Sequence, residues 1–137
     1  MDDVGLIHHL PVALGIGLLI GAERERRKVH RPAAAGLRTF TIAALLGCGA
    51  ALMPQQWMIA IVMLCMTALA LLSSWRRRNT TDPGITTEVS LVATTLLGAL
   101  AVTAPLLAGA LAVLIAIVLA ARDPLHRFVG QTISADE

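Results

Sequence analysis

The chain has 137 residues, of which 56% are hydrophobic and only 15% are charged. In a soluble domain about a quarter of the residues are charged. This composition therefore excludes an ordinary soluble protein and indicates a membrane protein. The net charge of +2 does not predict a nucleic-acid partner, because basic residues in membrane proteins serve as loop anchors.

Five apolar runs follow one another, at residues 4–22, 37–53, 57–75, 85–103 and 106–121. Each run is about 16 to 19 residues long, near the minimum for a helix that crosses a hydrocarbon core of about 30 Å. Helices are expected because lipid cannot satisfy exposed backbone groups. The sequence therefore predicts an all-α, polytopic membrane helix bundle with five transmembrane helices over residues 1–121.

Basic residues gather after the first, third and fifth runs, within residues 24–38, 76–78 and 122–127. With five crossings, all eleven Lys and Arg residues fall on one side of the membrane. Basic loops stay in the cytoplasm. We therefore expect the N-terminus outside and the C-terminus in the cytoplasm.

Residues 122–137 form a separate tail in this interpretation. Asp123 is a candidate N-cap and Pro124 suits the first position of a helix. The tail is therefore expected to be a short cytoplasmic helix that lies on the membrane surface.

Small residues recur at intervals of four along several runs, which allows helix backbones to approach closely. The residues expected to pack helices together are Gly17, Gly21, Gly47, Ala108, Ala112 and Ala116. The same faces are candidates for a homo-oligomer interface or for contact with a second membrane half. The lipid bilayer is the remaining expected partner.

Ionisable residues at the edge of a membrane helix are costly, which makes them candidates for a functional site. The predicted ion or polar cluster at the cytoplasmic boundary comprises Glu23, Arg38, Thr39, Thr86, Thr87, Glu88 and Asp123. In one interpretation Glu23 and Glu88 are candidate ligands for Mg²⁺, which binds one or two carboxylates and retains waters. In the other, Arg38 forms an ion pair with Glu23 or Glu88.

The basic residues next to the helices set the topology, and they are also candidates for contact with anionic lipid headgroups. This second set comprises Arg24, Arg26, Arg27, Lys28, Arg76, Arg77 and Arg78.

Three motifs resemble the MgtC/SapB family of bacterial inner-membrane proteins: IGAERER at 20–26, AGLRT at 35–39 and GITT at 84–87. Two features differ from the family pattern, since the third run has no glycine and Glu88 follows the Thr-Thr pair. These differences resemble a branch in which such a domain is followed by a second membrane half. The resemblance implies a multi-pass protein of the bacterial inner membrane with a link to magnesium.

Two hypotheses for function follow. In the first, the protein is an ion transport component connected to magnesium homeostasis. In the alternative, it is a non-transporting regulator that binds another membrane complex through its small-residue helix faces. No signature of a hydrolase, a nucleotide-binding loop or a zinc protease occurs in the sequence, so neither an enzyme nor catalytic residues are expected. Mg²⁺ is the one candidate cofactor.

Overall fold

A computed structural model describes residues 3–26, 35–76 and 86–133, with side chains over 8–26, 35–76 and 86–121. Five helices make up most of these ranges: α1 (Asp3–Arg26), α2 (Leu37–Leu52), α3 (Trp57–Arg76), α4 (Thr86–Thr103) and α5 (Pro105–Ile133). The described ranges contain no strand. The predicted all-α fold with five helices is confirmed.

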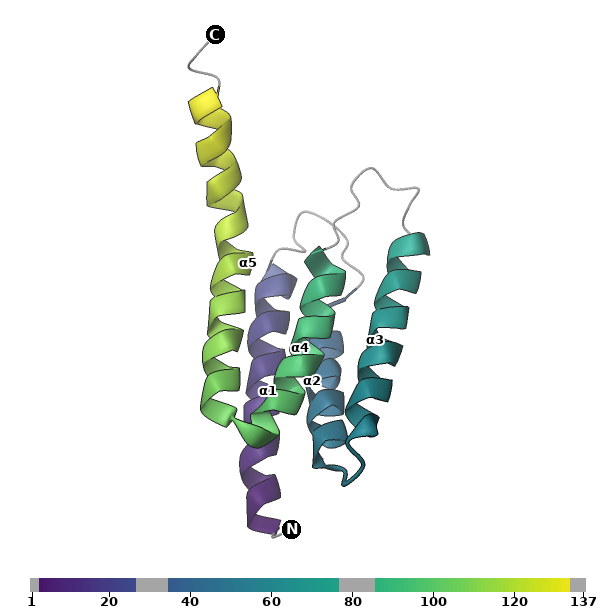
Figure 1. Ribbon diagram of the computed structural model, residues 1–137. Helices are drawn as coiled ribbons and strands as arrows, with labels where there is room; N and C mark the ends of the chain where they lie inside the picture. The colour runs from purple at the N-terminus through teal and green to yellow at the C-terminus, as the bar shows by residue number, and fades with distance from the viewer. Residues whose placement is uncertain (1–2, 27–34, 77–85, 134–137) are drawn as a thin grey trace.

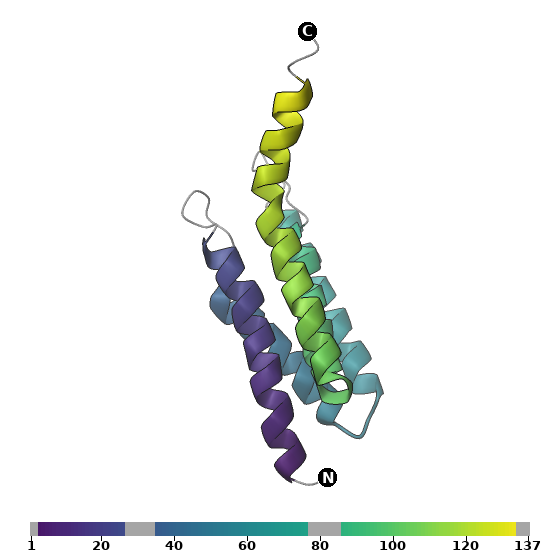
Figure 2. The same cartoon turned by 90° about the vertical axis from the view of Figure 1, so that its left-hand side faces the viewer.

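Successive helices run in opposite directions, so the C-terminal ends of α1 and α3 lie at the same end of the bundle as the N-terminal ends of α2 and α4 (Figure 1). Helix α4 contacts each of the other four helices. Helix α5 lies beside α1 and α4, as a second view also shows (Figure 2). Helix α3 is peripheral, because it contacts only α2 and α4.

The contact between α2 and α4 depends on two reciprocal glycines. A Cβ atom on Gly47 of α2 would collide with the carbonyl oxygen of Thr95, and one on Gly98 of α4 would collide with that of Ala44. The absence of both side chains lets each backbone lie directly on the other. This close approach is the small-residue packing that membrane helices use.

Helices α1 and α2 approach in the same way. A Cβ atom on Gly17 would lie 2.6 Å from the Cα of Thr41, and one on Gly21 would lie 2.9 Å from the Cα of Leu37. On α5, Ala108 and Ala112 are buried whereas Ala116 is half-buried. The small-residue faces predicted from the sequence are therefore occupied by neighbouring helices of the same chain.

Two helices of the described part are long and apolar enough to cross a membrane, α3 with a mean hydropathy of 2.2 and α4 with 1.4. Helix α2 and the segment Pro105–Ala121 are shorter apolar helices. The two long helices differ in burial, because 11% of the α3 span but 44% of the α4 span is buried inside the bundle. Helix α3 therefore presents most of its apolar surface outward.

The structure shows no helix break after the last apolar run, and the division into a five-helix domain and a tail stays a prediction. Helix α5 continues without interruption from Pro105 to Ile133 and projects beyond the other helices (Figure 1). A proline inside a helix removes one backbone hydrogen bond and kinks or breaks the helix. Pro11 lies within α1 in the same way.

Candidate functional site

Arg24 joins the C-terminal end of α1 to the first turns of α4. Its Nη2 donates to the carbonyl oxygen of Thr86 at 2.6 Å and to Oγ of Ser90 at 2.9 Å. Ser90 donates in turn to the carbonyl oxygen of Thr87 at 3.0 Å. Bonds from a guanidinium are charge-assisted and stronger than neutral ones, so Arg24 ties these two helix ends together.

A cavity of about 200 Å³ lies between α2, α3 and α4 at the same end of the bundle. Helix α4 contributes Thr87, Glu88 and Leu91 to its wall, and Thr39 of α2 adds a hydroxyl. The remaining lining residues, mostly on α3, are Ala35, Met66, Leu69, Ala70 and Ser73. The cavity has room for several water molecules, each of which takes about 30 Å³ in the liquid.

Glu88 is the ionisable residue that lines this cavity. Its Oε2 atom is buried and has no hydrogen-bond partner. An ionised carboxylate in such a position is costly unless a cation accompanies it. The arrangement therefore suits the binding of a cation with some of its water.

The predicted ion pair of Arg38 with Glu23 or Glu88 stays a prediction. Arg38 is exposed near the start of α2, and no hydrogen bond joins it to the buried Oε2 atom of Glu88. Glu88 lines the cavity between the helices, and Arg38 is not among its lining residues. Glu23 is half-buried on the last turns of α1. The side chain of Asp123 lies outside the described residues.

The predicted cluster is thus divided in the structure. Thr39, Thr87 and Glu88 line one cavity, whereas the carbonyl of Thr86 accepts the bond from Arg24. Among the described residues, no three His, Cys, Asp or Glu side chains are grouped as metal ligands. A carboxylate pair of Glu23 and Glu88 as ligands of Mg²⁺ stays a prediction.

The residues predicted to contact lipid headgroups differ in their exposure. Arg26 and Arg76 are exposed at the helix ends, whereas Arg24 is half-buried and bonded to α4. The other members, Arg27, Lys28, Arg77 and Arg78, lie outside the described residues. Arg24 therefore belongs with the site rather than with the surface.

The carboxylate of Glu25 makes a contact that the sequence did not predict. Its Oε2 accepts a hydrogen bond from the backbone N–H of Leu37 at 3.1 Å. Leu37 begins α2, and the N-cap residue Gly36 has no side chain to satisfy the free N–H groups there. Glu25 supplies that missing acceptor from the end of α1.

Ser90 is a site residue that sequence reasoning missed, and Arg24 is one that it assigned to lipid headgroups instead. A signal was present, because Thr86, Ser90 and Thr94 recur at intervals of four and place hydroxyls on one face of α4. Ser90 and Thr94 are buried. A polar stripe on a buried helix face points to a polar neighbour, and Arg24 is that neighbour.

The fold and the site define an all-helical protein with apolar helices and a polar, basic end. The model of the MgtC family matches residues 10–128, which include all of α2, α3 and α4 and most of α1 and α5, and the chain belongs to this family of membrane proteins. The resemblance inferred from the three motifs is confirmed. Comparison with curated proteins and with solved structures gave no match.

Proposed function

We propose that the chain is a multi-pass protein of the bacterial inner membrane, with five spans, an external N-terminus and a cytoplasmic C-terminus. The outward surface of α3 supports this, because Leu64, Leu71 and Trp75 are 65–71% exposed and need an apolar environment. The arginines Arg24, Arg26, Arg38 and Arg76 are at one end of the bundle. That end would face the cytoplasm.

We further propose that the protein is an ion transport component connected to magnesium homeostasis. The observation that carries this proposal is the cavity that reaches Glu88, whose Oε2 is buried without a hydrogen-bond partner. A carboxylate beside Thr39 and Thr87 supplies oxygen atoms, which Mg²⁺ prefers. A helix bundle without a cavity at Glu88 would not support a role in transport.

The test is divalent cation flux into liposomes that contain the purified chain and a divalent-sensitive dye. Glu88→Gln keeps the shape of the side chain but removes its charge, so flux should fall at least tenfold. Glu25→Gln is the matched control, since its amide oxygen still accepts the bond from Leu37 and its flux should stay near that of the unmodified protein. Absence of flux in the unmodified protein would reject the transport proposal.

The topology is tested separately with single cysteines in a background lacking Cys48 and Cys65. A cysteine at Gln55, between α2 and α3, should react with a membrane-impermeant maleimide in intact spheroplasts. A cysteine at Arg38 should react only after the membrane is opened. The reverse pattern would invert the proposed orientation.

The regulator alternative receives less support from the structure. It relied on small-residue faces for a partner complex, and Gly17, Gly21 and Gly47 pack against helices of the same chain. A second membrane half or a second copy would have to use another surface. We therefore favour transport.

A further inference from the structure

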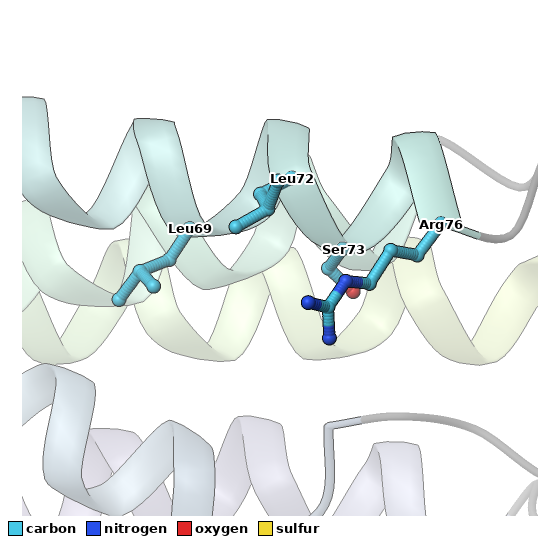
Figure 3. A pocket seen from close by; sticks show the side chains of 4 residues that line it. All are labelled: Leu69, Leu72, Ser73 and Arg76. Carbon is cyan, nitrogen blue, oxygen red and sulfur yellow. The ribbon is translucent and has the colours of Figure 1, made fainter.

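A groove runs along the outer part of α3 towards its C-terminal end. It has a volume of about 340 Å³ and is lined by Leu69, Leu72, Ser73 and Arg76. These residues are three, four and seven positions apart, which places them on one face of the helix. Figure 3 shows the two leucines along the groove and the guanidinium of Arg76 turned towards Ser73 at its end.

The polarity of the groove changes along the helix axis. Leu69 and Leu72 are apolar and more than half exposed, and the hydroxyl of Ser73 and the charge of Arg76 follow one turn later. Seven residues of helix correspond to about 10 Å. An apolar stretch that ends in a hydroxyl and a cation matches a molecule with a hydrocarbon chain and an anionic head.

The groove also adjoins the cavity at Glu88, because Leu69 and Ser73 line both. The described side chains on α3 that line the groove carry positive charge but no negative charge. The guanidinium of Arg76 therefore favours an anion over a cation at this end of the groove. Binding of an apolar peptide helix would not require a cation such as Arg76 at the end of the groove, so the groove fits an anionic lipid better than a peptide.

We propose that this groove binds one anionic phospholipid, with an acyl chain along Leu69 and Leu72 and the phosphate at Arg76 and Ser73. The proposal rests on the membrane location proposed above. The bound chain would lie against the outer wall of the cavity that contains Glu88. Phosphate binding by a guanidinium and a hydroxyl is favoured because both donate hydrogen bonds to phosphate oxygens.

The two tryptophans of the chain make the site measurable. Trp75 follows Leu72 by one turn, next to the proposed headgroup position, whereas Trp57 begins α3 about 27 Å away. Both are exposed. The full chain with Trp57→Phe reports on the groove, and the full chain with Trp75→Phe reports on the opposite end.

The experiment measures quenching of each tryptophan by brominated phosphatidylglycerol and by brominated phosphatidylcholine in vesicles of mixed composition. At Trp75, phosphatidylglycerol should bind about fivefold more strongly than phosphatidylcholine, the factor expected for one basic residue near an anionic lipid. Trp57 should show no preference. Soluble glycerophosphoglycerol or inorganic phosphate should not displace the lipid from the groove.

Arg76→Gln should abolish the preference at Trp75. Arg38→Gln is the matched control, because Arg38 is an exposed arginine at the same end of the bundle but outside the groove. Its preference should stay unchanged. Arg76→Lys should retain part of the preference, which separates the loss of charge from a change of fold.

Several results would overturn the proposal. Equal quenching of Trp75 by the two lipids would remove the anionic site, and so would an Arg38→Gln effect as large as that of Arg76→Gln. If either lipid quenches Trp57 but not Trp75, a second copy of the chain rather than a lipid covers the groove. Quenching of neither tryptophan would reject the membrane location itself, and with it the proposed function.

Discussion

The Nδ1 atom of His9 lies 3.1 Å from the carbonyl oxygen of Ala101 and joins α1 to the last turn of α4. In a continuing helix the backbone N–H of residue 105 would bond to this carbonyl. Residue 105 is a proline, which has no N–H. His9 therefore supplies, from another helix, the donor that Pro105 lacks.

Replacing His9 with leucine should destabilise the bundle by about 1–3 kcal/mol, since a buried carbonyl without a donor bears its desolvation cost. His9→Asn should recover part of the loss, because its amide nitrogen occupies a position close to that of Nδ1. The measurement is unfolding by SDS in mixed micelles. His8 is exposed, so His8→Leu is the control, and an equal loss there would contradict this role for His9.

The glycine contact between α2 and α4 should tolerate no added methyl group. Gly47→Ala would place its Cβ against the carbonyl oxygen of Thr95, and overpacking of this kind costs about 1–3 kcal/mol. Gly49 lies on the same helix with nothing within 4 Å of its Cβ position. Gly49→Ala should therefore be neutral or stabilising by up to about 1 kcal/mol, as helix propensity predicts. SDS unfolding of both variants checks this, and similar effects of the two changes would exclude close packing as the cause.

Arg24 should contribute more to stability than its neighbour Arg26. Arg24→Met removes the donors to Thr86 and Ser90, and hydrogen bonds to a charged group contribute about 1.5–3 kcal/mol. Arg26 is exposed, so Arg26→Met should change the unfolding free energy by less than about 0.5 kcal/mol. Equal effects in an SDS titration would assign Arg24 to the surface, as the sequence first suggested.

The helices could be predicted from the sequence because each is a long apolar run bounded by charged residues or by proline and glycine. The run predicted at 57–75 corresponds to α3 (Trp57–Arg76), and the run predicted at 85–103 corresponds to α4 (Thr86–Thr103). The end of the fifth helix could not be predicted in this way. Pro124 is compatible both with the start of a helix and with the interior of one, and local sequence does not decide between them.

The membership of the site could be predicted only in part. Glu23 and Arg24 are adjacent, so they point about 100° apart on α1. Which of them faces α4 depends on the order of helices around the bundle, and that order comes from packing at Gly17 and Gly47 rather than from local sequence. The sequence thus singled out Glu88, which lines the cavity, but it assigned Arg24 to lipid headgroups although Arg24 bonds to α4.

Filling the cavity should impair function without altering the carboxylate. Ala70 is buried on α3 and lines the cavity with Glu88, so Ala70→Leu adds three carbon atoms to that space. We expect divalent flux to fall at least fivefold while Glu88 remains in place. Ala68→Leu makes the same change at an exposed position of the same helix, and its flux should equal that of the unmodified protein. If Ala70→Leu conducts normally in liposomes and its SDS unfolding is unchanged, the ion does not pass through this cavity.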